Sequence, residues 1–565
     1  MSEPKSSQGL SRRRFLIQVG KVGGAAALYE AMTAMGLINV PQAWAGPLKF
    51  PENIGNGKTV VILGAGVGGL TTAYELSKIG YDCTILEAQN RVGGRNHTIR
   101  SGDVITEQSQ EHGVTEQVCH FEDDPEIYLN AGPGRIPYHH RRLIHYCNIL
   151  SVELENYVMN TTANLFQSDR SFGAEPQSYR QIKNDTQGYI AEMLAKCVDK
   201  GALDEELDLD ERQALLSLLK KWGMLGKGKD CFKYEYYGST NSGCRYPPSV
   251  YQQCEPPPPI PFSDLLQSRF WNNRFYQPDQ YEWQPTLFQP KYGMDMIIKG
   301  FERALQDKVS IQISSPVTEI NVLVNSVLVQ YDSHEGPQTI EADYVISSIP
   351  LPILSKISNN FTPDFSEAVD QARLAPTCKV GWQSYERFWE GQKYQIYGGI
   401  SWIDNIITQV WYPSNNYFAD IGVLTGLYNF GQRAIDFGRM SLQERLLVAK
   451  SGIRKLQPEF GIESIVPTDL GLSIAWQNVH FQQGGWVNWD PISAADAAAY
   501  ERLLQPEVGN RFYVVGDQVS SLPGWQEGAI MSAEHVVESI AGFKRRKRIQ
   551  PIIKAPDSRS ITGSD

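Results

Sequence analysis

The sequence predicts an α/β protein that combines a parallel sheet, a separate mixed sheet and a helical insertion. Residues 58–95 contain a short apolar run, a glycine-rich turn, a helical pattern and a second apolar run, the order found in a βαβ unit. Residues 309–349 instead alternate apolar and polar side chains, as half-buried strands do. Residues 203–224 carry apolar side chains at helical spacing.

The glycine-rich turn follows the apolar run 60–63, which is short and β-branched like a buried parallel strand. In the spacing G-x-G-x-x-G, the first glycine permits a tight turn and the second lets a pyrophosphate approach the backbone. The third lets the helix pack closely on the sheet. The glycines of this turn are Gly64, Gly66, Gly68 and Gly69.

A second strand, 83–86, ends at Glu87, which lies about 20 residues beyond the glycines. A carboxylate at this place can accept hydrogen bonds from a ribose 2′-hydroxyl. The unit therefore predicts a dinucleotide site, and it does not by itself choose between NAD and FAD.

Composition narrows the class of protein. The chain has 565 residues, 41% of them hydrophobic, and a net charge of −11, which argues against a nucleic-acid binder. Its basic run 544–548 is interpreted as a solvated helix end and tail. Neither C-x-x-C nor H-E-x-x-H occurs, so no metal site is expected, and His139 and His140 are interpreted as surface or supporting groups. A disulfide among Cys231, Cys244 and Cys254 remains open.

The first 45 residues are expected to be an export signal. Residues 11–16, SRRRFL, resemble the bacterial twin-arginine motif, and Ala43-Trp44-Ala45 resembles an A-x-A cleavage site. The stretch between them is rich in Gly and Ala and contains Lys21 and Glu30, so it is not expected to span a membrane. Because the twin-arginine machinery exports folded proteins with cofactors already bound, the mature protein is expected to be periplasmic or secreted.

The rest of the chain gives a coarse order of elements. Residues 238–290 are rich in Tyr, Trp, Gln, Gly and Pro, and are interpreted either as irregular structure that lines a cavity or as a surface excursion. The other expected elements are a loop at 106–124, a helix from about Tyr138, helices over 150–225, strands over 309–349 and 376–490, a strand at 512–515 and a helix at 526–543.

Two motifs at opposite ends of the chain carry a family resemblance. Residues 91–95, RVGGR, and residues 511–533, RFYVVGDQVSSLPGWQEGAIMSA, resemble segments of the flavin amine oxidase superfamily, and within it the L-amino-acid oxidases. The resemblance extends from Lys58 to about Phe543 and implies a glutathione-reductase-like FAD-binding domain with a mixed-sheet substrate domain. The expected segments are a signal peptide (1–45), three parts of the FAD-binding domain (46–135, 286–375 with a β-meander, and 506–545), a helical and substrate-domain region (136–285), a substrate-binding sheet domain (376–505) and a tail (546–565).

The resemblance also implies which residues hold FAD. Asp517 stands where the family usually has Glu. The Asp side chain is shorter, but its carboxylate can still accept hydrogen bonds. Gly484-Gly485 is followed by Trp486 and not by the cysteine of covalent flavin enzymes, so non-covalent FAD is expected. Beside the four glycines and Glu87, the implied cofactor-binding residues are Arg95, Gly134, Arg135, Val317, Gly516, Asp517 and Trp525.

Four residues are implied to act on the substrate. Arg135 matches the arginine that grips the α-carboxylate, a task suited to a planar, permanently charged guanidinium. Tyr412 matches a tyrosine that binds the same carboxylate, Lys379 a lysine that holds a water near flavin N5, and Trp525 an aromatic wall beside the substrate amine.

The expected reaction is oxidation of an L-amino acid to an imino acid by hydride transfer from Cα to flavin N5. Water hydrolyses the imino acid to a 2-oxo acid and ammonia, and oxygen reoxidises the reduced flavin and becomes hydrogen peroxide. Three alternatives stay open: an amine or polyamine oxidase, an amino-acid 2-monooxygenase, and a flavin-binding protein without oxidase activity. Trp402, Ile403 and Asp404 are candidates for contact with the substrate side chain, where Asp404 would attract a cationic one. The sequence does not decide whether the protein is a homo-oligomer.

Overall fold

The computed structural model describes residues 44, 46–226, 234–490 and 493–542. Of the predicted export signal, only Trp44 is described. Cys231, the basic run 544–548 and the C-terminal tail also lie outside the described residues. Within the described part of the chain, no helix is long and apolar enough to cross a bilayer.

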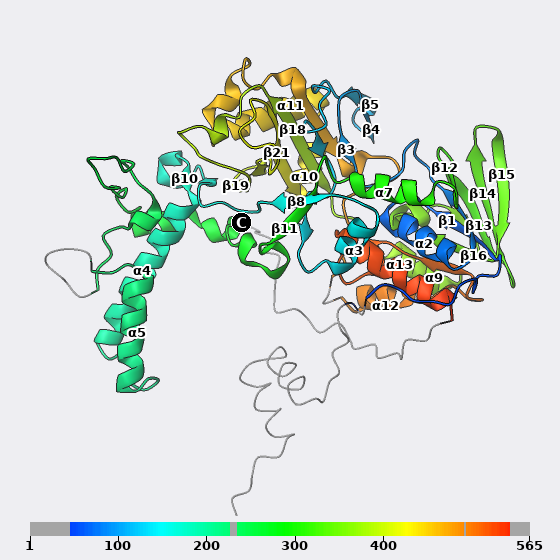
Figure 1. Ribbon diagram of the computed structural model, residues 1–565, viewed down its shortest axis with the longest axis horizontal. Helices are drawn as coiled ribbons and strands as arrows, with labels where there is room; N and C mark the ends of the chain where they lie inside the picture. Colours follow the sequence, from blue (N-terminus) through cyan, green and yellow to red (C-terminus); the bar gives the residue numbers. More distant parts are fainter. Residues whose placement is uncertain (1–43, 45, 227–233, 491–492, 543–565) are drawn as a thin grey trace, which may run out of the picture.

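The first sheet is parallel throughout, as the βαβ unit predicts. Its strand β1 pairs with two neighbours, so that Val61 lies between Thr84 and Val345. In spatial order the strands are β12 (Ser310–Gln312), β2 (Asp82–Leu86), β1 (Thr59–Leu63), β16 (Tyr344–Ser347) and β23 (Phe512–Val514). The α/β fold class is therefore confirmed, and Figure 1 shows this sheet among the helices of one half of the molecule.

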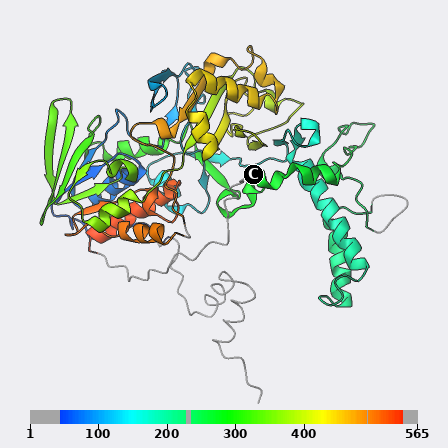
Figure 2. The same cartoon turned by 180° about the vertical axis from the view of Figure 1, so that it is seen from behind.

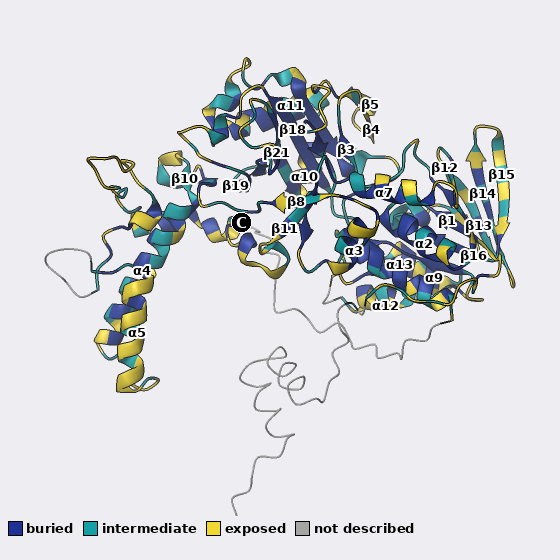
Figure 3. Ribbon diagram, viewed as in Figure 1, coloured by how far each residue is buried: buried dark blue, intermediate teal, exposed yellow. Residues whose placement is uncertain are grey.

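Both faces of the parallel sheet are covered, because alternate side chains of β1 point to opposite sides. Val60 and Ile62 pack in one core with α2 (Val67–Lys78), α7 (Met296–Leu305) and α13 (Gln526–Ile540). Val61 and Leu63 pack in a second core with α8 (Leu351–Leu354), α9 (Pro363–Asp370) and α12 (Ala494–Leu503). Figure 3 shows that the sides of these helices facing the sheet are buried.

A β-meander extends the second core. Strands β13, β14 and β15 are antiparallel, and the short β17 runs parallel to β13. Their bounds are β13 (Val317–Val322), β14 (Val327–Ser333), β15 (Gly336–Ala342) and β17 (Ser358–Asn359). The alternation over 309–349 thus predicts β13, β14 and β15 correctly. Strands β12 and β16 of the same stretch join the parallel sheet instead, and β17 lies beyond it.

A seven-stranded mixed sheet forms the other half of the molecule. Its strands in order are β10 (Gln177–Ser178), β9 (Leu165–Gln167), β19 (Ile400–Ile403), β20 (Thr408–Trp411), β21 (Gly422–Phe430), β18 (Thr377–Ser384) and β22 (Gly471–Ala475). In β18, Cys378, Val380 and Trp382 pack against α10 (Gln432–Gly438) and α11 (Leu442–Ile453). The alternation of the strand therefore turns Lys379 to the opposite face. The strand-rich prediction for 376–490 did not foresee these two helices.

Three smaller sheets complete the fold, and two of them correct the sequence analysis. The predicted loop at 106–124 contains a hairpin of β4 (Val104–Ser109) and β5 (Gly113–Val118). The first part of the predicted helical stretch 150–225 contains β8 (Leu154–Tyr157), β9 and β10 instead. The remaining strands are β3 (Thr98–Ile99) with β6 (Leu129–Asn130), and β7 (Ile136–Pro137), β11 (Leu287–Pro290) and β8 (Leu154–Tyr157) in one three-stranded sheet.

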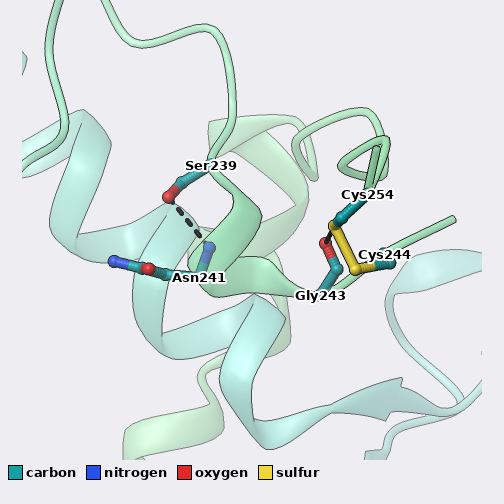
Figure 4. Close-up of a disulfide and its surroundings, with 5 residues drawn as sticks. All are labelled: Ser239, Asn241, Gly243, Cys244 and Cys254. Atoms are coloured by element: carbon teal, nitrogen blue, oxygen red, sulfur yellow. Dashed lines mark hydrogen bonds between the residues drawn. A yellow bond between two sulfur atoms is a disulfide. The ribbon is translucent and has the colours of Figure 1, made fainter. Parts of the chain in front are cut away.

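A helical arm projects from the body of the molecule, as Figures 1 and 2 show from opposite sides. It consists of α4 (Tyr179–Asp199) and α5 (Leu209–Trp222). The apolar spacing over 203–224 predicts α5, and α4 lies in the predicted helical stretch 150–225. Near its base, Cys244 and Cys254 form a disulfide with their Cα atoms 5.2 Å apart (Figure 4). The remaining α-helices are α3 (Arg141–Ile149) and α6 (Phe262–Ser268).

Short 3₁₀ helices bend the chain between the larger elements. They are η1 (Phe172–Ala174), η2 (Thr240–Ser242), η3 (Phe270–Asn273), η4 (Gln277–Asp279), η5 (Tyr281–Trp283), η6 (Phe388–Glu390), η7 (Pro458–Gly461), η8 (Thr468–Leu470), η9 (Trp476–Asn478) and η10 (Asp517–Val519).

Candidate functional site

A deep cavity lies at the carboxyl ends of the parallel strands and reaches the mixed sheet. Gly64, Glu87, Ser348 and Gly516 line it, and each comes at or just after the end of a strand of the parallel sheet. Lys379 of the mixed sheet lines the same cavity. Open α/β sheets bind their ligands at this edge, so the cavity is the candidate site.

The glycine turn has the geometry that its spacing predicts. Gly64 has a φ of +98°, a conformation that favours glycine, and a Cβ on Gly69 would lie 2.1 Å from the Gly64 carbonyl oxygen. Helix α2 begins after Gly66 with no side-chain cap and no acidic residue in its first turn. Its first N–H groups are therefore available to an anionic ligand such as a pyrophosphate.

Glu87 is a buried carboxylate in the cavity wall. Its Oε2 accepts a hydrogen bond from the Ala65 amide at 2.7 Å, and its Oε1 accepts one from the Gln89 amide at 2.9 Å. Burial raises the pKa of Glu87, while these bonds and Arg91 act in the opposite direction. A carboxylate has about four acceptor positions, so Glu87 can still accept bonds from the hydroxyls of a ribose.

Arg95 and Asp517 join the two sequence motifs at this cavity. The guanidinium of Arg95 donates to the Asp517 carboxylate and to the Gly485 carbonyl, and the Gly524 amide donates to Asp517 Oδ2 at 2.8 Å. Both ion-pair partners line the cavity, together with Val317 at the start of β13. The glycine walls, the open helix terminus and the spare acceptors of Glu87 together fit a bound dinucleotide.

Lys379 and Tyr428 are directly paired residues on the antiparallel strands β18 and β21. Lys379 Nζ donates to the carbonyl of Asn130 at 2.9 Å and to that of Gly132. Burial, with a smaller effect of Arg135, lowers the pKa of Lys379 to about 7. A neutral amine can keep both of these hydrogen bonds and still offer a lone pair, so Lys379 can accept a proton from water or substrate near neutral pH.

Arg135 is buried beside this pair of strands. Pairing of β11 with both β7 and β8 brings Arg135, which precedes β7, close to Tyr157, whose hydroxyl lies 3.4 Å from Nη1. The Cζ atom lies 4.1 Å from the Trp283 ring centroid and 4.6 Å from that of Trp411. Its Nε has no hydrogen-bond partner, and no carboxylate among the described residues pairs with it. A buried guanidinium of this kind is suited to an anionic ligand.

Aromatic rings surround these cations. Trp525 lines the cavity and lies 5.1 Å from Trp283 between ring centroids, and Trp411 lies 5.0 Å from Tyr428. Phe430, which points to the same side of β21 as Tyr428, contacts it and Trp486. This aromatic wall consists of Trp283, Trp411, Tyr428, Phe430, Trp486 and Trp525.

His140 packs against the aromatic wall. Of the two interpretations of this residue, a surface group and a supporting group, the structure agrees with the second. His140 is 1% exposed, and its ring lies perpendicular to that of Trp525 with centroids 4.9 Å apart. Neither ring nitrogen has a partner, and burial, with a smaller effect of His139, lowers the pKa of His140 to about 3. His140 is therefore neutral over the usual working range of pH. No group of His, Cys, Asp or Glu among the described residues is arranged to hold a metal.

The structure does not bring Tyr412 into the cavity. Its hydroxyl accepts a hydrogen bond from Ser401 Oγ at 3.0 Å and donates one to Gln457 Oε1 at 2.9 Å, inside the core between the mixed sheet and its helices. The tyrosine that does face the cavity is Tyr428, which sequence reasoning missed. Tyr428 could have been chosen from the sequence only through its pairing with Lys379, and this pairing is known only once the strand register is known.

Other expected contacts are also placed elsewhere. Asp404 lies 3.7 Å from Arg433 in an ion pair, while Trp402 and Ile403 are buried in two hydrophobic cores. Gly134 does not line the cavity of Lys379, and it allows close packing because a Cβ there would lie 2.8 Å from the Trp411 ring.

Comparison with known proteins agrees with this site. Residues 67–541 match the family described as flavin-containing amine oxidoreductase. A flavin-dependent L-tryptophan oxidase from Lentzea aerocolonigenes is 24% identical over 512 residues, which cover 86% of this chain and 98% of that protein. An L-amino-acid oxidase from Crotalus adamanteus is 23% identical over 494 residues, which cover 84% of this chain and 86% of that protein.

A solved structure shows the same fold. Wild-type putrescine oxidase bound to putrescine matches with a TM-score of 0.54 and 18% identity, covering 86% of this chain and 99% of that one. Because the family match spans most of the chain, a flavin is the cofactor that the dinucleotide cavity accommodates. The chain belongs to the flavin-containing amine oxidoreductase family.

Proposed function

We propose that the protein is an FAD-dependent oxidase of L-amino acids. The observation that carries the proposal is Arg135, a buried guanidinium beside the cavity with no carboxylate partner among the described residues. An amino acid would supply that partner through its α-carboxylate, whereas a simple amine has no anionic group to offer. The names of the L-tryptophan oxidase and of the Crotalus adamanteus L-amino-acid oxidase support the same choice.

The residues of the site would have different roles in the reaction. A bound flavin would supply the redox chemistry, as acceptor of the Cα hydrogen with two electrons (a hydride) and as donor of these electrons to O₂, which would become hydrogen peroxide. Arg135 would hold the α-carboxylate, so that the substrate is oriented before the reaction. Lys379, with its pKa near 7, would exchange a proton with water next to the reacting atoms. Water then hydrolyses the imino acid to a 2-oxo acid and ammonia.

We propose FAD as the flavin and non-covalent binding. Glu87 supports an adenosine ribose, and the bare N-terminus of α2 supports a pyrophosphate. The described residues that line the cavity include neither cysteine nor histidine, and Trp486 follows Gly485 in its wall. Precipitation of the protein with acid should therefore release the whole flavin into the supernatant, and protein-bound absorbance after this treatment would exclude the non-covalent form.

Anaerobic reduction of the flavin tests the reaction. L-amino acids should bleach the oxidised flavin, whereas their D-enantiomers and putrescine should not. Readmitted oxygen should restore the colour with one equivalent of peroxide. Bleaching by amines alone would identify an amine or polyamine oxidase. An amide product with little peroxide would identify a 2-monooxygenase, and no bleaching by any of these compounds would leave a flavin-binding protein without oxidase activity.

We also propose export by the twin-arginine route. The motif at residues 11–16 supports it, and so does the Cys244–Cys254 disulfide, because such bonds persist mainly in oxidising compartments. Replacement of both Arg12 and Arg13 by Lys should retain the flavin-loaded protein in the cytoplasm. Unchanged secretion of this variant would exclude the proposed route.

A further inference from the structure

A second guanidinium, that of Arg274, lies against the aromatic wall near Arg135. Its Cζ atom is 3.9 Å from the centroid of the Phe430 ring. Phe430 contacts Tyr428, and Tyr428 is acted on electrostatically by both Arg135 and Arg274. The two arginines therefore approach the same end of the cavity from different segments of the chain.

Arg274 is held in place by its neighbours in sequence. It follows η3, and the buried rings of Phe270 and Phe275 on either side of it contact each other with centroids 4.6 Å apart. Phe275 also stacks on Tyr179 of α4 at 4.3 Å. The backbone at Arg274 is thus anchored in a core, although the residue itself is exposed.

The charge of Arg274 is not balanced by the protein. No carboxylate among the described residues forms an ion pair with it. The acids of its own segment act elsewhere, Asp279 on Tyr179 and Tyr276, and Glu282 on His139. Burial and, to a smaller extent, Arg135 lower the pKa of Arg274, while Tyr428 opposes the shift.

The carboxylates of the cavity wall are already engaged. Glu87 accepts two backbone amides at the far end, and Asp517 is bound to Arg95. Asp404, the acid that the sequence offered as a partner for cationic side chains, pairs with Arg433. The charged or chargeable groups around Tyr428 are therefore cationic: Lys379 lines the cavity, and Arg135 and Arg274 lie beside the aromatic wall at this end.

We propose that Arg274 binds an acidic group on the substrate side chain, so that dicarboxylic L-amino acids such as L-glutamate or L-aspartate are the preferred substrates. This inference rests on the proposed function, in which Arg135 binds the α-carboxylate. A substrate with an uncharged side chain would neutralise one guanidinium and leave the other without a counter-charge. A dicarboxylic substrate neutralises both, and a planar guanidinium binds a carboxylate with two parallel hydrogen bonds.

Matched pairs of substrates test the inference, because L-glutamate and L-glutamine differ little in shape. The wild-type enzyme should prefer glutamate over glutamine by about 30-fold or more in kcat/KM, and aspartate over asparagine in the same direction, which corresponds to about 2 kcal/mol. In Arg274→Gln, the glutamate preference should fall at least tenfold, mainly through a higher KM for glutamate, with glutamine little changed. Arg274→Lys should retain part of the preference because it keeps the charge.

Arg269→Gln is the matched control, since Arg269 is an exposed arginine at the other end of η3 and shares the left-handed backbone conformation of Arg274. It should leave the glutamate-to-glutamine ratio unchanged. A ratio near one in the wild type, or the same ratio in Arg274→Gln, would overturn the inference. An equal loss for glutamate and glutamine would also overturn it, because Arg274 would then serve the α-carboxylate.

The two proposals can fail separately. If neutral L-amino acids bleach the flavin as well as acidic ones do, the proposed function stands and the role of Arg274 does not. If no L-amino acid bleaches the flavin, the proposed function itself fails. Flavin absorbance of each variant checks that it has folded, and the wild-type ratio together with Arg274→Lys decides the question if Arg274→Gln does not fold.

Discussion

The guanidinium of Arg95 binds the carboxylate of Asp517 across a sequence separation of 422 residues. The Asp517 side chain is 7% exposed and that of Arg95 26% exposed, so the ion pair is largely shielded from water. It links the segment after the first βαβ unit to the segment before α13, on the wall of the flavin cavity.

Asp517→Asn should weaken flavin binding. The substitution keeps the shape of the side chain but leaves the Arg95 charge without its partner, so the Kd for FAD should rise by about 10- to 100-fold, or about 1.4–2.8 kcal/mol. The measurement is the flavin retained after gel filtration, followed by titration of the apoprotein with FAD. Asp364→Asn is the control, because Asp364 pairs with Arg502 at a site where it is 65% exposed. Equal retention in both variants would contradict the expected role.

Lys379→Met should stabilise the fold, and more so at low pH. The pKa of Lys379 falls from 10.5 to about 7 on folding, so the folded protein binds fewer protons than the unfolded chain between these values. The free energy of unfolding of the wild type therefore rises with pH through this window, and the full cost of the buried charge is present below pH 7.

The advantage of Lys379→Met should thus be greatest near about pH 6, of the order of a few kcal/mol, and should shrink toward about pH 10. Urea denaturation with excess FAD at several pH values measures it. Lys356→Met, a change at an exposed lysine, is the matched control and should follow the wild type. A pH-independent difference would show that Lys379 does not change its protonation on folding.

The two tyrosines should respond differently to loss of the hydroxyl. Tyr428→Phe removes a cavity-lining hydroxyl on which Arg135 and Arg274 act electrostatically, so kcat/KM should fall about 10- to 100-fold while the stability changes little. Tyr412→Phe removes the acceptor of the Ser401 hydroxyl and the donor to Gln457 Oε1, so it should cost about 1–3 kcal/mol of unfolding free energy with little change in kinetics. Steady-state kinetics and urea denaturation of both variants measure the contrast. A loss of kcat/KM in Tyr412→Phe and not in Tyr428→Phe would show that Tyr412 is the tyrosine that acts on the substrate.

Arg135→Lys should separate amino acids from amines. The change keeps a positive charge but removes the planar fork that binds a carboxylate with two hydrogen bonds, so kcat/KM for L-amino acids should fall about 100-fold. Any residual turnover of an amine such as putrescine should not fall, because an amine makes no use of Arg135. Parallel losses for both substrate classes would indicate that Arg135 supports the aromatic wall and not the substrate.

The sequence predicted the nucleotide end of the site better than the substrate end. Gly64 and Glu87 belong to one local unit whose spacing is fixed by a strand, a turn and a helix, so their places follow from short-range geometry. Arg95 follows this unit and was predicted from the family resemblance. Tyr428 could not be chosen over Tyr412, because the strand register decides which tyrosine faces the cavity.

Arg274 and Trp283 were missed for another reason. They belong to the irregular stretch 238–290, in which no periodicity shows the direction of a side chain. The two interpretations of that stretch both apply, to different parts of it: Trp283 contacts Trp525 of the cavity wall, while Val250 and Tyr251 are almost fully exposed. Long-range packing alone separates the two parts.

The parallel sheet is completed by its last strand, β23, which begins at Phe512 and pairs with β16 at the sheet edge. A ribosome makes the chain from the other end, so the glycine turn emerges long before Asp517 and α13 exist to close the cavity. The cofactor can be enclosed only after nearly the whole chain has been synthesised. Only a complete polypeptide can therefore retain the flavin, because an incomplete chain lacks the part of the cavity wall that Asp517 and α13 form.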